Sequence, residues 1–69
     1  MHRRFILERV ADPSGVSGLG VVAEGVLFAN GKCVLGWLMI TASVAVYDSM
    51  EALIEVHGHA GSTLVRWVD

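Results

Sequence analysis

Two runs of β-forming residues joined by Asn30-Gly31 dominate the hydrophobic pattern of the chain. Residues 21–28 and 32–39 are rich in valine and leucine and contain phenylalanine and tryptophan, all of which suit the pleated surface of a sheet. Asn-Gly accepts the positive φ that a tight hairpin turn requires. The pattern therefore predicts a central β-hairpin, with a β-bulge at Glu24-Gly25, where the apolar run is interrupted.

Three further segments, residues 4–10, 43–47 and 63–68, are predicted as strands from their apolar, β-branched and alternating residues. The first and second strands are separated by a long loop, since proline and several glycines fall between them. The strand at 32–39 is apolar on both faces. We therefore expect a helix or a partner chain to cover one of its faces.

A change of period after the fourth predicted strand indicates a short helix. Asp48 is in position to cap it, and Met50, Leu53 and Ile54 recur at the spacing of one helical face. Gly58 is expected to end the helix in a positive-φ conformation. Because a helix of about nine residues is unstable by itself, its apolar face must pack on the sheet.

These elements predict one mainly β domain, residues 1–69, with five antiparallel strands and one short α-helix between strands 4 and 5. Two architectures fit the pattern. The first is a small SH3-like barrel, whose closure would remove exposed strand edges. The second is an open antiparallel sheet with the helix on one face.

Composition points to self-association. The chain has 69 residues, of which 54% are hydrophobic and 17% charged. Because a domain of about 60 residues buries only about 60% of its unfolded surface, surplus apolar side chains are expected on an interface between subunits. We therefore expect a homo-oligomer that associates through apolar sheet faces. The net charge of −2 speaks against direct binding of nucleic acid, which normally requires a basic surface.

The single cysteine, Cys33, excludes an internal disulfide framework and fits a reducing compartment. The apolar stretch at residues 5–7 is too short for a secretory signal. The longest uncharged run, residues 33–47, is shorter than the roughly 20 residues of a membrane-spanning helix. We therefore expect a soluble protein of the cytoplasm, which is the host cytoplasm if a phage encodes it, without a membrane partner.

Three motifs carry a resemblance to a known group of sequences. They are V-S-G-x-G-V-V-A-E-G-V at 16–26, S-[IM]-E at 49–51, and H-G-H-x-G at 57–61 followed by Trp67. With them, nearly the whole chain resembles a family of short hypothetical proteins of bacteria, notably actinobacteria, and of their bacteriophages. The resemblance brings no known activity. It implies an intracellular accessory protein in a phage context.

No group of residues forms a catalytic, metal or cofactor signature. His57-Gly58-His59 lacks the further ligands that zinc needs. The glycine run at 15–20 leads into a β-run and not into a helix, unlike a dinucleotide-binding loop. Serines and histidines define a catalytic triad only through their geometry. We therefore expect a non-catalytic protein with no metal and no cofactor.

Two glycine-bearing bends, at 16–20 and 58–62, are the candidate ligand sites, because backbone N–H groups in such bends can bind an anion. A histidine, an arginine and a tryptophan nearby could pair with or stack on the ligand. The predicted ligand-binding residues are Val16, Ser17, Gly18, Gly20, His57, His59, Gly61, Ser62, Arg66 and Trp67.

We expect a small binding protein, for which three hypotheses remain open. In the first, a phage-encoded anti-defence factor sequesters a small anionic ligand, a nucleotide-type immune signal, as an oligomer. In the second, it inhibits a host nucleic-acid-binding effector such as a CRISPR nuclease, whose basic channel would attract its carboxylates. Those carboxylates are Glu8, Glu24, Glu51 and Glu55. In the third, it is a structural or assembly subunit.

Overall fold

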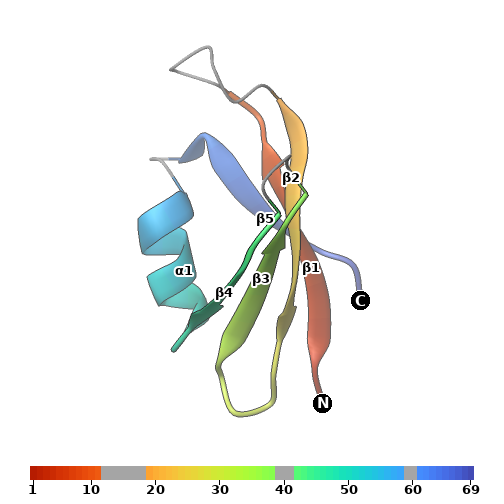
Figure 1. Cartoon of the computed structure of the whole chain (residues 1–69), viewed down its shortest axis with the longest axis vertical. Helices are drawn as coiled ribbons and strands as arrows, with labels where there is room; N and C mark the ends of the chain where they lie inside the picture. The colour runs from red at the N-terminus through yellow and green to blue at the C-terminus, as the bar shows by residue number, and fades with distance from the viewer. Residues whose placement is uncertain (12–18, 39–41, 59–60) are drawn as a thin grey trace.

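The computed structural model describes residues 1–11, 19–38, 42–58 and 61–69. Within these residues, one antiparallel sheet in the order β4-β3-β2-β1-β5 carries one helix, α1, between its fourth and fifth strands (Figure 1). The elements are β1 (Arg3–Arg9), β2 (Gly20–Leu27), β3 (Cys33–Trp37), β4 (Val44–Tyr47), α1 (Met50–His57) and β5 (Thr63–Trp67). The predicted mainly β fold is confirmed. Among the described residues β4 and β5 remain separate edges, as in the open-sheet architecture.

The hairpin between β2 and β3 forms where Asn30-Gly31 predicts it. The Phe28 amide donates to the Lys32 carbonyl at 2.9 Å, and the Gly31 amide donates to the Phe28 carbonyl at 2.9 Å. Gly31 has a φ of +91°, which a glycine adopts without strain. The Asn30 side chain accepts the Lys32 amide at 2.9 Å. Asparagine and glycine therefore each supply the contact that a three-residue hairpin loop needs.

Alternation along the strands divides the sheet into two faces. The inner face lies against α1 and forms the core, in which Leu53 of the helix is fully buried. The outer face lies on the side opposite the helix. The core consists of Phe5, Leu7, Val22, Ala23, Cys33, Leu35 and Leu53. The outer face consists of Arg4, Ile6, Glu8, Glu24, Val26, Val34, Gly36, Val44, Val46, Leu64, Arg66 and Val68.

The β-bulge of β2 lies elsewhere than predicted. Glu24-Gly25 pairs regularly with both neighbouring strands. The register shifts instead where Leu7 pairs with Ala23 but Glu8 pairs with Val21, so that β2 holds one extra residue. Two consecutive residues of β2 are buried there, which a regular strand with alternating faces does not allow.

Gly25 is required by close packing and not by a bend. A Cβ atom at this position would lie 2.4 Å from Cζ of Phe5 and 2.6 Å from the carbonyl oxygen of Val34. The ring of Phe5, which is 1% exposed, therefore occupies the space that any side chain at position 25 would need. The prediction of a bulge at this glycine was wrong because close packing gives the same signal in sequence.

The helix forms as predicted, but both of its ends differ in detail. The N-cap is Ser49 and not Asp48, since the Ser49 hydroxyl accepts the Ala52 amide at 3.0 Å. At the other end Gly58 keeps a helical conformation, with φ −68° and ψ −30°. The positive φ expected there falls on Gly61 instead, at +94°. The helix therefore ends at His57 as predicted, but the positive-φ turn follows three residues later than the pattern indicates.

Cys33 provides a test of how tightly the core is closed. Burial of this fully buried thiol, and secondarily the charge of Glu51, raise its pKa. Because the pKa of Cys33 is higher in the folded state, the thiol does not lower the free energy of unfolding at pH values below its unfolded pKa of 9.0. Above that pH the thiol ionises more readily in the unfolded state, so the free energy of unfolding falls as the pH rises. At pH 8 we expect Ellman's reagent to react with native protein at least about 100-fold more slowly than with unfolded protein. Equal rates would show that the core opens freely.

Candidate functional site

A groove of about 470 Å³ lies between the C-terminal end of α1 and the edge strand β5. This volume falls within the roughly 300–1,000 Å³ of small-molecule sites. Figure 1 shows β5 returning beside the end of the helix, so that two elements form its walls. We call it the β5 groove, and its lining residues are Ile54, Gly58, Gly61, Thr63, Leu64, Val65 and Trp67.

One end of the β5 groove carries an arginine and a threonine. Thr63 pairs with Arg9 across β5 and β1, and Nε of Arg9 donates to Oγ1 of Thr63 at 3.5 Å. On its other side Arg9 pairs with Gly20, the first residue of β2. Among the described residues Arg9 forms no ion pair with a carboxylate. Its charge is therefore available to an anion at this end of the groove.

The other end carries a tryptophan and a second arginine. Trp67 is 40% exposed, and the guanidinium of Arg3 lies over its ring at 4.0 Å from the centroid. Phe5 holds the ring from the side, with centroids 5.6 Å apart in an edge arrangement. A cation over an aromatic face and an apolar support beside it fix the ring in place. Cationic groups thus stand beside both ends of an apolar groove.

The four arginines of the chain lie on the neighbouring strands β1 and β5. Two of them are already paired on the surface. Nε of Arg4 lies 3.0 Å from Asp69, and Arg66 is paired with Glu8. The Arg4 backbone amide, followed by its side chain, holds the pKa of the exposed Asp69 carboxyl below its usual value. Of the inner-face arginines, Arg3 also donates from Nε and Nη2 to the Asp69 carbonyl at 3.3 and 3.2 Å, whereas Arg9 has Thr63 as its side-chain partner.

Gly61, Ser62 and Trp67 are the predicted residues that the structure brings to this groove. Gly61 and Trp67 line it, and Ser62 lies between Gly61 and the groove residue Thr63. The Ser62 carbonyl accepts the amides of Val10 and Ala11 at 2.8 and 3.3 Å. The bend between α1 and β5 is thereby tied to the end of β1, next to Arg9.

Two backbone donors on the described part of this bend are used within the chain. The amides of Gly61 and Thr63 both donate to the Gly58 carbonyl at 3.1 Å. A ligand at the β5 groove would therefore meet arginine and hydroxyl groups, in place of the row of free amides that the glycine-rich sequence predicts. The glycines instead allow the chain to turn sharply from the helix into β5.

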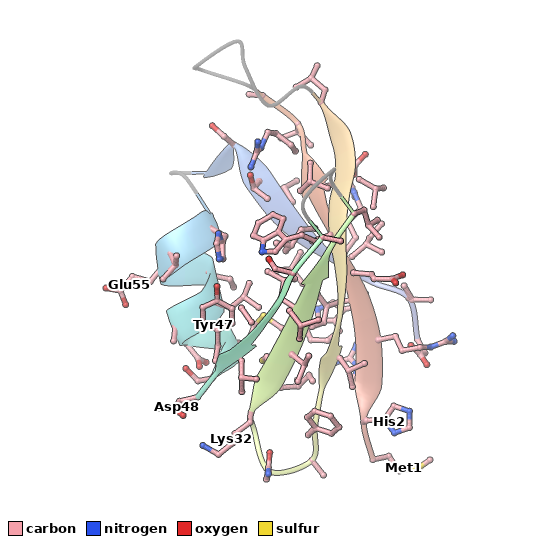
Figure 2. All side chains as sticks on the ribbon, viewed as in Figure 1. Met1, His2, Lys32, Tyr47, Asp48 and Glu55 are labelled. Atoms are coloured by element: carbon pink, nitrogen blue, oxygen red, sulfur yellow. The ribbon has the colours of Figure 1, made fainter. Side chains whose placement is uncertain are left out.

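His57 lies on the far side of the helix end from the β5 groove. Its Nε2 is hydrogen bonded to the hydroxyl of Tyr47, and its ring packs edge-on against Trp37 with centroids 4.9 Å apart. Tyr47, labelled in Figure 2, reaches from β4 toward the helix. This contact holds the last turn of α1 on the sheet, so the structure gives His57 a packing role.

The other predicted ligand residues are not gathered in one place. Gly20 pairs with Arg9 at the end of the sheet that carries Thr63. Arg66 points to the outer face, whereas its neighbour Trp67 faces the core. These two side chains therefore cannot contact the same ligand from one face of the sheet. Val16, Ser17, Gly18 and His59 lie outside the described residues.

The glutamates of the inhibitor hypothesis are divided between two sides of the molecule. Glu8 and Glu24 lie on the outer face, while Glu51 and Glu55 lie on α1, which packs on the opposite side of the sheet. Figure 2 shows Glu55 pointing away from the sheet. These four side chains therefore do not form one acidic surface.

The described residues hold neither a metal-binding cluster nor a helix long and apolar enough to cross a membrane. No three histidine, cysteine, aspartate or glutamate side chains among them come close enough to hold a metal ion. The helix in this part of the chain has eight residues, fewer than a membrane crossing requires.

Sequence comparison identifies a family for this chain. Over residues 2–69 it matches the family described as Acb5 phage protein. No curated protein and no solved structure matches it. The phage context implied by the resemblance is thereby supported, while the match does not test the individual motifs. Since the match spans almost the full length, the chain belongs to the Acb5 phage protein family.

Proposed function

We propose that this protein is a non-catalytic anti-defence factor that sequesters a nucleotide-type immune signal in the β5 groove. The family name suggests a phage protein of the anti-CBASS type, which agrees with action against a bacterial defence. The oligomer expected from the composition is part of the proposal, because several copies present several grooves.

The chemistry of the β5 groove supports a nucleotide. Nucleotides combine negative phosphates with a flat, partly apolar base. Arg9 beside Thr63 offers charge-assisted hydrogen bonds to a phosphate, which are stronger than neutral ones. The apolar wall of Ile54 and Val65, with the half-exposed ring of Trp67, suits a base.

The observation that carries the proposal is the placement of Arg3 and Arg9. Both belong to the inner face of β1, at its two ends, and each contacts a residue that lines the groove. Six residue steps at about 3.4 Å place the two positions about 20 Å apart along the strand. A ligand with phosphates at separated positions therefore fits better than a single small anion.

Calorimetric titration tests this proposal. We expect cyclic dinucleotides to bind the wild-type protein, and Arg9→Gln to weaken binding by about 10-fold or more, since a hydrogen bond to a charged group contributes about 1.5–3 kcal/mol. The matched control is Lys32→Gln, which removes the same charge at the hairpin, where Lys32 pairs with Asp48 at 2.9 Å. The control should bind as the wild type does.

Two results would contradict the proposal. One is the absence of binding heat with a panel of cyclic and linear nucleotides. The other is equal weakening by Arg9→Gln and Lys32→Gln, which would mean that the ligand responds to net charge and not to the β5 groove.

A further inference from the structure

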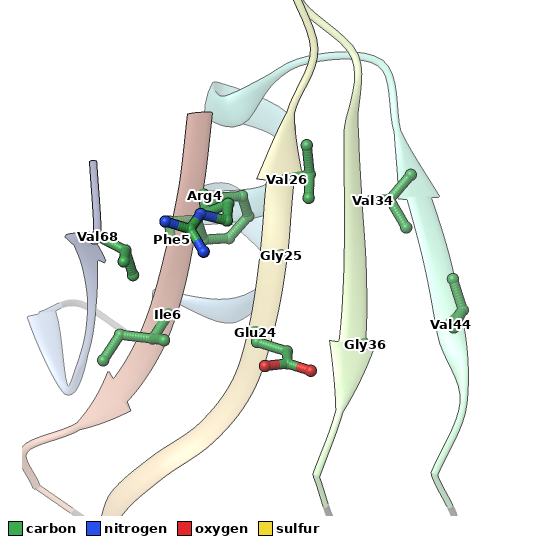
Figure 3. A pocket seen from close by; sticks show the side chains of 10 residues that line it. All are labelled: Arg4, Phe5, Ile6, Glu24, Gly25, Val26, Val34, Gly36, Val44 and Val68. Atoms are coloured by element: carbon green, nitrogen blue, oxygen red, sulfur yellow. The ribbon is translucent and has the colours of Figure 1, made fainter. Parts of the chain in front are cut away.

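The outer face of the sheet is apolar and uncovered. Val44 and Val46 on β4 are 70% and 66% exposed, and Val68 after β5 is 55% exposed. Figure 3 shows valines of adjacent strands side by side on this face, with the helix behind the sheet. No element among the described residues packs on it. Large apolar patches on a protein surface usually mark a site where another molecule binds.

This face is also hollowed. A depression of about 500 Å³ runs across β1, β2, β3 and β4. Gly36 of the outer face contributes no side chain to it, so the apolar groups around this glycine form its rim (Figure 3). Its lining residues are Arg4, Phe5, Ile6, Glu24, Gly25, Val26, Val34, Gly36, Val44 and Val68. The surface can therefore receive side chains of a partner.

The outer face carries two arginines, and with Asp69, the partner of Arg4, it has three carboxylates. Arg66 and Glu8 form an ion pair with each other near one end. Arg4 and Glu24 lie on neighbouring strands, and both line the depression. Among the described residues Glu24 has no ion-pair partner. The Arg4 side chain is still 61% exposed beside Asp69, so it can accept Glu24 of a second copy as a further carboxylate partner.

The size of the face suits a modest dimer. Five strands about 4.8 Å apart, with outward positions over about 20 Å of strand length, cover roughly 500 Å² per copy at most. Two copies would bury about 1,000 Å², which is the size of a weak or transient protein interface. We therefore expect the dimer to form mainly at the higher protein concentrations of a titration.

We infer that the outer face is the interface of a two-fold homodimer, in which Arg4 of each copy meets Glu24 of the other. The two-fold axis lies in the plane between the two stacked sheets and passes midway between the positions of Arg4 and Glu24. Rotation about it places Arg4 of one copy opposite Glu24 of the other, and Glu24 of the first opposite Arg4 of the second. The apolar side chains of both sheets then fill the depressions. The interface lies opposite the groove residues Ile54, Val65 and Trp67, meets the β5 groove at Leu64, and does not depend on any ligand there.

Sedimentation equilibrium from 1 to 200 µM tests this inference by charge reversal. We expect the wild type to shift from the 7.4 kDa monomer to a species of twice that mass. Glu24→Arg brings cations together across the interface and Arg4→Glu brings carboxylates together, so each should weaken association at least about 10-fold. The double variant Glu24→Arg/Arg4→Glu should restore it to within about 3-fold of wild type.

Two controls separate this interface from other causes. Glu55→Arg makes the same charge change as Glu24→Arg on the exposed surface of α1 and should leave the dimer intact. Val44→Lys alters a side chain that is already 70% exposed, so it leaves folding unaffected while it weakens the dimer. Circular dichroism verifies the fold of every variant.

The inference is overturned if the wild type remains a monomer at 200 µM, or if Glu24→Arg and Val44→Lys associate as the wild type does. It is also overturned if the double charge reversal fails to recover association, since a foreign partner or another face would then be responsible. Nucleotide binding by a persistently monomeric wild type would leave the proposed ligand groove standing while excluding this dimer.

Discussion

Replacing Gly25 with alanine is expected to destabilise the protein by about 2–3 kcal/mol, because overpacking a core costs about 1–3 kcal/mol and here one obstacle is backbone. The new Cβ would lie 2.4 Å from the Phe5 ring and 2.6 Å from the Val34 carbonyl oxygen. The ring can turn only into a packed core, since Phe5 is 1% exposed. Urea denaturation followed by tryptophan fluorescence measures the loss.

Gly36→Ala is the matched control for this prediction. The same methyl group at Gly36, one strand away, would have the Glu24 carbonyl oxygen at 3.7 Å as its nearest neighbour, an ordinary contact. We expect stability to stay the same or to rise by about 0.5 kcal/mol, since alanine loses less backbone entropy than glycine on folding. Both variants are compared at a concentration where they are monomers, because association adds to apparent stability. Equal destabilisation by the two substitutions would contradict the packing described for Gly25.

Replacing Leu53 with alanine is expected to cost about 2–5 kcal/mol, the range for removing a fully buried leucine. Leu53 is the helix residue with no exposed surface, and it packs on the inner face of the sheet. A chain of this length has a total stability of only about 3–10 kcal/mol. The variant should therefore be largely unfolded at 37 °C, which thermal melts by circular dichroism will show.

Val56→Ala is the corresponding control on the same helix. Val56 is 56% exposed, and alanine favours the helix more than valine does. We expect a change within about 0.5 kcal/mol. If Leu53→Ala and Val56→Ala melted together, α1 would not be the cover of the inner face.

Local patterns in the sequence were sufficient to predict the elements of the fold. Asn30-Gly31 supplies both contacts of its turn, and the alternation in β3 places Cys33 and Leu35 in the core. Such signals depend on neighbours within a few residues. The positions of the N-cap and of the bulge were wrong, because Ser49 competes with Asp48 for the cap and because Gly25 is explained only by a ring from another strand.

The candidate site depends on contacts that a local pattern does not contain. Arg9 meets Thr63 across 54 residues of chain, and Arg3 meets Trp67, because β1 pairs with β5 at the edge of the sheet. The alternation of β1 already places both arginines on one face. What could not be predicted is that β5 lies beside these arginines. For this reason the glycines of the bend suggested backbone amides as the ligand donors, and the guanidinium groups were missed.

An amide and indole NMR titration with a cyclic dinucleotide tests the central claim, that the β5 groove binds the ligand. The chain has two tryptophans, of which Trp67 lines the groove while Trp37 packs against His57. The account predicts that the indole signal of Trp67 and the amide signal of Gly61 shift with ligand while the indole signal of Trp37 stays in place. Shifts confined to outer-face residues such as Val34 and Val44, or no shifts at saturating ligand, would contradict it.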